Sequence, residues 1–440
     1  MPIERAVAWI VAGLLLFLSA SVAQAQLPIQ HWQTKSGARV YLVENHDLPI
    51  LDVTVDFPAG SGFDTPEKSG LASMTNHMLR LGADGLSEDE IARGFADVGA
   101  QVASRFDSDR GGLGLRTLSS PTEREQALGL LLRILRRPEF PQAVLEREKV
   151  RAVDAIREAE TRPEALSDRV FQQLLYQGHP YGLRSLGEVD TVQKLARADI
   201  AEFYQRHYTV QHAVVAMTGD LTRREAEALA ERIASVLPSG EAAAPAPPPV
   251  PPLEKSVTRY VAHPASQSHI VVGAPGLRRG DPDYFPLLVG NFVLGGGGFV
   301  SRVNIEVRQK LGLAYSASSY FYPLKREGPF VMSMQTQRER ALEALNAARK
   351  TLRDYVAEGP TEAELTAAKQ NIVRGFPLRI DTNRKINEHL ALIGVYGLPL
   401  TYLEDYVKNV ERVSVADVKS AFQKRIDPDR MVTVIVGPSE

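Results

Sequence analysis

The chain has 440 residues, of which 44% are hydrophobic and 24% are charged, and its formal net charge at pH 7 is -2. This composition is typical of soluble globular proteins, and the length is sufficient for two or more domains. The near-neutral charge argues against a nucleic-acid-binding protein, which would carry a strongly basic surface. The sequence contains no cysteine, so disulfides, thiolate nucleophiles and cysteine-ligated metals are all excluded.

The N-terminus has the pattern of a secretory signal peptide. Arg5 precedes an apolar run from Ala6 to Ala20, and Ala23-Gln24-Ala25 has the form of a cleavage site. We therefore predict a signal peptide over residues 1–25. An uncleaved anchor is the alternative, but the apolar run is shorter than the ~20 residues that span a bilayer. We expect an exported protein of the bacterial periplasm, with no stable membrane insertion after cleavage.

A segment rich in proline and alanine divides the rest of the chain into halves of similar length. It covers residues 238–255 and includes Pro245-Ala246-Pro247-Pro248-Pro249. Proline fixes φ and removes backbone donors, which favours an extended, semi-rigid linker over packed structure. We expect an N-terminal domain over residues 26–237 and a C-terminal domain over residues 256–440.

The two halves contain a repeated pattern. Ala198 corresponds to Ala416 and Gly219 to Gly437, with a constant offset of 218 residues. Each copy predicts an amphipathic helix, a turn and a short apolar strand that ends in glycine. Strand patterns also occur near the start of each half, at residues 40–43, 51–57 and 268–273. The repeat predicts two related α+β domains.

The segment from Ser69 to Leu79 has the frame of a metal-binding helix but lacks most of the ligands. Residues four apart share one helix face, so such a zinc site needs ligands at positions 73 and 77 and a water-activating carboxylate between them. The sequence has Ser73, Asn76 and His77 there. A serine hydroxyl is a weak zinc ligand, and an asparagine amide cannot take a proton from water at neutral pH. On these grounds His77 is an ordinary helix histidine.

This segment nevertheless resembles the inverted zinc motif H-x-x-E-H of the pitrilysin or insulinase-like metallopeptidases, in its usual surroundings G-x-A-H-x-x-E-H-M. Gly70, Ala72, His77 and Met78 match those surroundings, whereas the first histidine and the glutamate are replaced. The resemblance implies a third zinc ligand, usually a glutamate, further along the chain. Here the corresponding position is close to Asp154.

Asp154 lies in a charged stretch, Pro141 to Glu160, that predicts a helix. An aspartate could ligate zinc, but its reach is shorter than that of glutamate and the first ligands are missing. We expect Asp154 to be a solvated helix carboxylate and the metal site to be lost.

The second half contains the glycine run Gly295-Gly296-Gly297-Gly298. The run lacks the Gly-Lys-Ser/Thr ending of a P-loop and the acidic ribose partner of a dinucleotide site, so we do not expect nucleotide binding. Glycine instead allows two backbones, or a backbone and a peptide, to approach closely.

The segment around this run is similar to the second signature of the same family, L-G-G-G-x-x-S-R-L followed by R-E-x-x-G-L-A-Y. There, Arg and Tyr lie across the cavity from zinc, hold the peptide and polarise its scissile carbonyl. The resemblance implies these roles for Arg308 and Tyr315, and both side chains can donate the hydrogen bonds required. Gln309 stands where the family often has glutamate. The alternative is a surface arginine and a core tyrosine.

The resemblance covers essentially the mature chain. It implies an α+β fold of two homologous halves, each a mixed, mainly antiparallel sheet with helices packed on it, arranged as a clamshell around a peptide chamber. Bacterial and organellar members of this size often pair a zinc-bearing subunit with one that carries the Arg/Tyr half. We expect a non-catalytic subunit of an exported heterodimeric zinc metallopeptidase. By this interpretation the chain binds no cofactor, and a homologous partner with an intact H-x-x-E-H supplies zinc for peptide hydrolysis.

Two alternatives stay open at this point. The chain could be an active zinc endopeptidase with an atypical site that uses His77, Asp154 and a further ligand. It could also be a peptide-binding or scaffolding protein of the cell envelope. Serine hydrolysis through Ser73 is disfavoured, because its surroundings do not form a nucleophile elbow.

Overall fold

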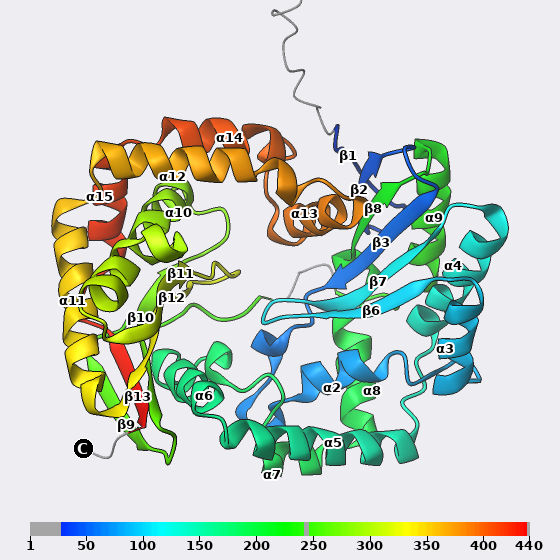
Figure 1. Cartoon of the computed structure of the whole chain (residues 1–440). Helices are drawn as coiled ribbons and strands as arrows, with labels where there is room; N and C mark the ends of the chain where they lie inside the picture. Colours follow the sequence, from blue (N-terminus) through cyan, green and yellow to red (C-terminus); the bar gives the residue numbers. More distant parts are fainter. Residues whose placement is uncertain (1–27, 242–245, 438–440) are drawn as a thin grey trace, which may run out of the picture.

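Two separate β-sheets, one from each half of the sequence, organise the computed structural model of the chain (Figure 1). The structure describes residues 28–241 and 246–437, so the predicted signal peptide lies outside the described residues. The first sheet has six strands in the order β1-β2-β8-β3-β7-β6, and the second has five in the order β11-β12-β10-β13-β9. The predicted α+β class with two homologous halves is confirmed.

The two sheets have corresponding strand pairings. The first contains β1 (Gln30–Gln33), β2 (Arg39–Glu44), β3 (Ile50–Phe57), β6 (Gln101–Phe106), β7 (Gly111–Leu118) and β8 (Val214–Gly219). The second contains β9 (Val257–Ala262), β10 (Gln267–Leu277), β11 (Ala314–Phe321), β12 (Gly328–Gln337) and β13 (Val432–Gly437). β8 pairs in parallel with β2, as β13 does with β9, and the other pairs are antiparallel. A two-stranded hairpin joins β4 (Gly82–Ala83) and β5 (Leu86–Ser87).

The repeat predicted from the sequence is confirmed at the level of single residues. Helix α8 (Arg197–His207) precedes β8 as helix α15 (Val415–Arg425) precedes β13, with the same offset at every boundary. Both strands end in a glycine of positive φ, 138° at Gly219 and 145° at Gly437. Only glycine adopts this conformation without strain, which explains why both copies keep it.

Helices cover the sheets. Those of the first half are α2 (Leu71–Met78), α3 (Glu88–Asp97), α4 (Pro121–Arg136), α5 (Gln142–Glu160), α6 (Pro163–Leu175), α7 (Val189–Lys194), α8 and α9 (Arg223–Val236). Those of the second half are α10 (Tyr284–Asn291), α11 (Ala341–Glu358), α12 (Glu362–Gly375), α13 (Asn383–Tyr396), α14 (Tyr402–Arg412) and α15. Within the described ranges, no helix has the length and apolar character needed to cross a membrane.

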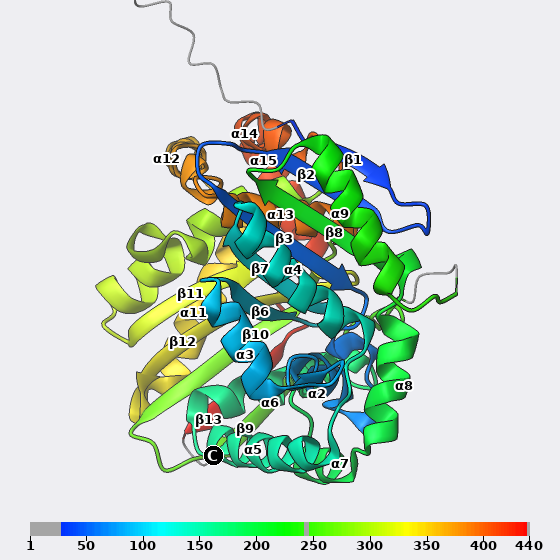
Figure 2. The same cartoon turned by 90° about the vertical axis from the view of Figure 1, so that its right-hand side faces the viewer.

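Each sheet is also covered by a helix from the other half of the sequence. Helix α6 packs against β10 and β13, and helix α13 packs against β2, β3 and β8. In both views these two helices lie at opposite ends of the junction between the halves (Figures 1 and 2). Apolar side chains of α6 and α13 therefore complete cores that belong to the opposite sheet. Two of the hydrophobic cores therefore contain residues from both predicted domains.

The exchanged helices approach their sheets very closely. On the first sheet, a Cβ added to Gly394 of α13 would lie 2.4 Å from Cγ1 of Val214 and 2.7 Å from Cε2 of Tyr41. On the second sheet, a Cβ added to Gly273 would lie 2.7 Å from Cζ of Phe171 in α6. A glycine at each contact therefore provides room for an aromatic ring of the opposing element.

A buried carboxylate ties the halves together at the turn between β6 and β7. Asp109 accepts hydrogen bonds from the Tyr396 hydroxyl at 2.8 Å and the Lys325 backbone N–H at 2.8 Å, both from the second half. The Tyr181 hydroxyl of the first half donates to the same carboxylate. Burial raises the pKa of Asp109, and the hydrogen bonds from the two tyrosines and from the Lys325 amide offset part of this rise.

The described part of the predicted linker is bound to the folded halves. Residues 246–256 form no helix or strand, and residues 242–245 lie outside the described residues. The Pro248 carbonyl lies 2.9 Å from Nε2 of His179, and the Pro247 carbonyl accepts from Nε of Arg326 at 2.7 Å. The segment is thus held at neighbouring carbonyls by one residue from each half.

We predict that Gly394→Ala lowers the free energy of unfolding by about 1–3 kcal/mol, because the added methyl group overlaps Val214 and Tyr41. Gly129→Ala in α4 is the matched control, since nothing lies within 4 Å of its added Cβ. Removing a helical glycine should leave stability unchanged or raise it by up to ~1 kcal/mol. Urea unfolding of both variants measures the difference, and equal effects would contradict the close contact at Gly394.

Candidate functional site

The degenerate motif lies on helix α2, whose N-terminus is fixed by a buried carboxylate. Asp64 accepts from the backbone N–H groups of Gly70 at 2.9 Å and Ala72 at 2.8 Å, which satisfies two of the donors that a helix start leaves free. Gly70 has a φ of 91°, a conformation that glycine adopts readily. Gly70 and Ala72 of the motif are thus held by contacts with Asp64 that do not involve metal.

Asn76 is buried and acts as a structural residue. Its side-chain N–H donates to the Arg105 carbonyl of β6 at 3.1 Å, and its side-chain oxygen accepts from the Tyr208 hydroxyl at 3.0 Å. The amide therefore uses its donor and acceptor to join α2 to a strand and to the end of α8. At the position where the family's chemistry needs a carboxylate to activate water, this chain has a neutral cross-link.

His77 lies within hydrogen-bonding distance of a residue that was not among the expected site residues. Its Nε2 lies 3.0 Å from Oε2 of Glu148 in α5, whose side chain is only 4% exposed. Glu148 also accepts from Nε of Arg147 at 2.7 Å and from a terminal nitrogen of Arg151 at 2.8 Å. Burial raises the pKa of Glu148, but the hydrogen bonds from His77 and Arg147 outweigh it and the net shift is downward.

The sequence contained a signal for Glu148. It lies on the buried face of α5 with Leu145, Val153 and Ile156, as a charged residue at an apolar position. Such a carboxylate needs a partner, and His77 and the arginines provide it. The position implied by the resemblance, Asp154, is exposed.

The motif does not form a metal site in the described part of the chain. Ser73 is half-buried on α2, and His77 is paired with Glu148. Within residues 28–241 and 246–437, no group of three or more His, Asp or Glu side chains is placed to hold a metal ion. An active zinc site built from His77, Asp154 and a further ligand is therefore not formed by this arrangement.

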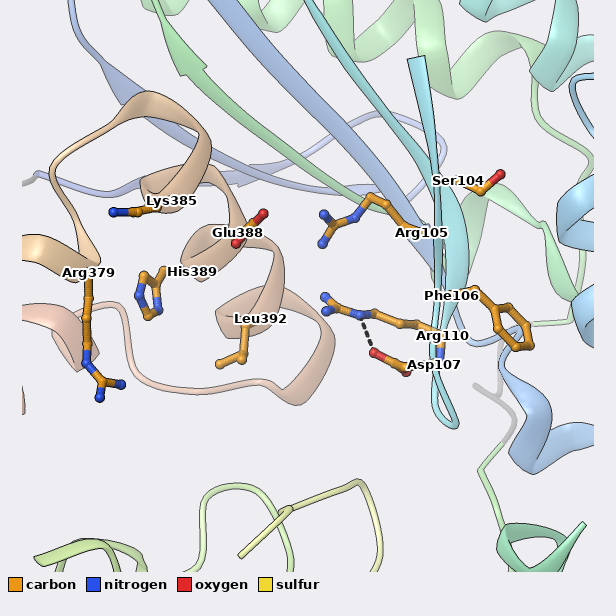
Figure 3. A pocket seen from close by; sticks show the side chains of 10 residues that line it. All are labelled: Ser104, Arg105, Phe106, Asp107, Arg110, Arg379, Lys385, Glu388, His389 and Leu392. Atoms are coloured by element: carbon orange, nitrogen blue, oxygen red, sulfur yellow. Dashed lines mark hydrogen bonds and ion pairs between the residues drawn. The ribbon is translucent and has the colours of Figure 1, made fainter. Parts of the chain in front are cut away.

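A polar cavity of about 390 Å³ lies between the β6–β7 hairpin and α13 (Figure 3). Arg105 and Arg110 extend from the hairpin toward Glu388 of α13. Behind them the fully buried Asp56 accepts from Nε of Arg105 at 2.9 Å and from a terminal nitrogen of Arg110 at 3.1 Å. The two guanidinium groups are thus held in fixed orientations at the wall of the cavity.

The opposite wall of this cavity combines cations with a neutral imidazole. Lys385 and His389 lie on α13, and Arg379 lies on the short helix η9 (Pro377–Arg379) that precedes it. Burial lowers the pKa of His389, and the charge of Arg379 lowers it further, so its ring is neutral at pH 7. With Glu388 on the same helix and Asp107 on the hairpin, the cavity presents charges of both signs and suits polar groups.

The glycine run of the second half is wound rather than extended. It spans a π-helical turn, η5 (Phe292–Gly296), and a short helix, η6 (Gly298–Val300). A Cβ added to Gly295 would lie 2.3 Å from Oγ of Ser319 in β11, so glycine is required by close packing there. The predicted close approach of two backbones is what the structure has at this glycine.

Two signature residues after the glycines are structural. The Ser301 hydroxyl donates to the Gly298 carbonyl at 2.7 Å, and Arg302 makes a two-pronged contact with Glu364 of α12, both distances being 2.7 Å. The Arg302 guanidinium lowers the pKa of Glu364 to about 2, so the pair stays ionised. These contacts hold the loop against the helices behind it.

Arg308 and Tyr315, the residues with expected substrate roles, lie on the elements that follow. Arg308 belongs to the π-helix η7 (Asn304–Lys310), and its guanidinium carbon lies 4.6 Å from the ring centre of Phe299. Tyr315 stands at an irregularity in β11, between the paired residues Ala314 and Ser316, and is 57% exposed. The alternative expectation of a core tyrosine is therefore wrong, whereas a ligand can reach the phenol.

Residues 39–188 match the insulinase family (peptidase family M16), and residues 194–372 match the peptidase M16 inactive domain. The chain belongs to the insulinase family. It is 26% identical over 403 residues to the non-peptidase homolog YmxG of Helicobacter pylori, with 90% of each chain covered.

A further relative and a solved structure agree with this membership. The mitochondrial-processing peptidase subunit beta of Blastocladiella emersonii is 25% identical over 417 residues, which cover 92% of this chain and 88% of that one. The structure of a peptidase M16 inactive domain from Pseudomonas fluorescens matches with a TM-score of 0.90 and 34% identity, over 94% of this chain and 99% of that chain. The predicted resemblance and the clamshell fold are confirmed, and the chain is a homologue of insulinase-family peptidases with a degenerate zinc motif.

We predict that Asn76→Ala lowers the free energy of unfolding by about 1–3 kcal/mol, since it leaves the Arg105 carbonyl and the Tyr208 hydroxyl without their partner. Ser73→Ala on the same helix is the control and should change stability by no more than ~0.5 kcal/mol. Chemical denaturation of the two variants measures both effects. An Asn76→Ala variant as stable as wild type would mean that the amide cross-link contributes nothing.

The imidazole of His207 in α8 predicts a dependence of stability on pH. It packs against Phe203 and lies 2.9 Å from the Pro58 carbonyl, and burial lowers its pKa to about 4. The unfolded chain takes up this proton below its ordinary pKa of ~6.5, whereas the folded chain does so only near 4. Stability from this group is therefore present at neutral pH and is lost as the pH falls from ~6.5 toward 4.

Between pH 7.5 and pH 5.0 this loss amounts to about 2 kcal/mol, and His207→Gln should remove it. Urea unfolding of wild type and variant at the two pH values measures the difference in slope. The pH dependence of wild type must be compared with that of the variant. Burial raises the pKa of Asp64 to about 7, so Asp64 makes stability fall as the pH rises, which is opposite to the effect of His207. Identical pH slopes in both would contradict the assignment to His207.

Proposed function

We propose that the chain is a non-catalytic subunit of an exported heterodimeric zinc metallopeptidase that hydrolyses peptides. The observation that carries the proposal is the buried amide of Asn76, which replaces the water-activating carboxylate while Arg308 and Tyr315 of the second signature are kept. A homologous partner with an intact H-x-x-E-H would supply zinc, the activated water and the general base. Export rests on the signal pattern of residues 1–25.

In this proposal Arg308 and Tyr315 hold the substrate peptide. The guanidinium of Arg308 packs on Phe299 and offers paired donors suited to a peptide carbonyl or carboxylate. The exposed phenol of Tyr315 can donate one hydrogen bond to the oxyanion that develops during hydrolysis. Arg308 lies on η7, which packs against the glycine run's η6 and against β11, the strand that contains Tyr315. A relative that is itself named as a subunit of a processing peptidase supports division of labour between chains.

A second candidate function is a peptide-binding or scaffolding protein of the cell envelope. It is favoured by two neighbouring apolar residues, Phe299 and Val300, which are 64% and 70% exposed. Exposed apolar surface of this kind is typical of protein interfaces, whether or not the partner is an enzyme. The two candidates differ in one respect that can be measured. Only a peptidase subunit should change the rate at which its partner cleaves peptides.

The test uses the mature chain beginning at Gln26, purified from the periplasm, alone and mixed with a co-purifying homologue that has an intact motif. We expect less than stoichiometric zinc and no cleavage of a fluorogenic peptide by the chain alone, and cleavage on mixing. Tyr315→Phe should lower kcat of the mixture by roughly 10²-fold, the scale for loss of one oxyanion donor. Arg308→Ala should lower kcat/KM.

Lys310→Gln is the matched control, because this neighbouring cation pairs only with Glu306 on its own helix and should leave the rate unchanged. Stoichiometric zinc with chelator-sensitive cleavage by the chain alone would overturn the proposal. A stable complex whose activity is unaffected by Tyr315→Phe and Arg308→Ala would favour the scaffolding function instead.

A further inference from the structure

A second cavity, of about 490 Å³, lies in the C-terminal half and shares Arg379 with the cavity of Figure 3. Its walls come from the end of β10, from α10, from the glycine run and from the second part of β11. Most of its lining is aromatic or aliphatic and includes Tyr284, Leu288, Phe292, Phe321, Tyr322 and Ile372. The volume lies within the usual range for ligand pockets.

The charges in this second cavity are of one sign. Arg279 and Arg379 line it, and no Asp or Glu among the described residues does so. In a chain whose net charge is -2, two arginines at one apolar cavity without a carboxylate form a local site for an anion. Their guanidinium groups offer forked donors that match a carboxylate.

Arg279 has an unused donor at this place. Its Nε is buried and has no hydrogen-bond partner, while its guanidinium carbon lies 5.5 Å from the ring centre of Tyr396. Within the described residues Arg279 forms no ion pair with an Asp or Glu, so no carboxylate of the chain neutralises its charge. The Arg379 side chain extends away from Arg105 and Arg110 (Figure 3), and therefore away from the carboxylates that pair with those residues.

The two arginines act on the same region of the molecule. Burial lowers the pKa of His389, and the positive charges of both Arg379 and Arg279 lower it further. The Glu388 carboxylate also acts on this imidazole, but it does not line the second cavity. The two guanidinium groups thus lie near the same imidazole, at the end of the cavity that Arg379 lines.

We propose that this cavity binds the C-terminal residue of a peptide, with its apolar side chain among the aromatic walls and its terminal carboxylate between Arg279 and Arg379. A C-terminal apolar residue carries both groups on one Cα, as the lining requires. An internal Asp or Glu would present the charge without the large apolar side chain. The inference rests on the proposed function only in taking a peptide as the ligand.

The site is separate from the proposed substrate clamp. Arg308 and Tyr315 do not line the cavity, whereas Gly295, Gly296 and Gly298 of the same signature do. A peptide held by its C-terminus here would therefore be gripped at a second place, next to the glycine run. This would select peptides that have a free, apolar C-terminus.

The test measures binding of an N-terminally fluorescein-labelled decapeptide that ends in phenylalanine to the whole mature chain, by fluorescence polarisation. We expect the free acid to bind at least ~10-fold more tightly than the C-terminal amide, because charge-assisted hydrogen bonds are the stronger ones. Arg279→Gln and Arg379→Gln should each abolish most of this preference. Arg278→Gln and Arg374→Gln, which alter exposed arginines outside the cavity lining, should keep it.

Arg379→Gln keeps the test valid if the half-buried Arg279 proves necessary for folding, since Arg379 is exposed. Equal affinity for acid and amide, or equal losses in the control variants, would overturn the inference. Neither result depends on the clamp residues, which are tested separately by the activity of the mixed subunits.

Discussion

The structure depends on an exchange of helices between its halves. Helix α6 completes the core of the second sheet and α13 that of the first, and at each contact a glycine makes room for an aromatic ring. Burial of apolar surface is the main favourable contribution to folding, and part of the burial at each sheet is provided by the other half of the chain. The buried Asp109, bonded to tyrosines from both halves, adds a polar connection at the same junction. The cavity of Figure 3 lies where α13 of the second half meets the β6–β7 hairpin of the first.

The lost metal site shows how a catalytic position can be reused for structure. In α2 the amide of Asn76 connects a helix, a strand and the end of α8, and His77 is engaged by Glu148. Asn76 and His77 thus both have partners within the protein. Restoring the carboxylate alone would place a charge in a buried position whose present neighbours are a carbonyl and a hydroxyl, at a cost in desolvation. The chain thus has the fold of the insulinase family, with internal hydrogen bonds at two positions of its degenerate zinc motif.

Much of the fold could be predicted from the sequence, because local signals and the repeat agree. The copies that end at Gly219 and Gly437 and the helix within the stretch from Pro141 to Glu160 all occur as expected. The exchange of α6 and α13 could not be foreseen, since amphipathic periodicity shows that a helix has an apolar face but not which sheet covers it. The family resemblance pointed to Asp154 as the acidic residue near His77. The contact of His77 is instead with Glu148, six residues earlier on the same helix, because spacing along the chain does not show which side chain faces α2. Tyr315 was expected to be functional from a resemblance, and only the structure shows that its ring is exposed.

The helix exchange also constrains the order in which the chain can fold. As residues emerge in sequence, the first sheet can form all its strands by Gly219, yet the face that α13 covers stays bare until Tyr396 has been made. Until then its apolar strands are open to non-native contacts, the usual hazard of large proteins with long-range pairings. The N-terminal half is therefore a late-maturing part of the molecule, although it is synthesised first. A cell that makes this protein must keep the growing chain from aggregating until its last third has appeared.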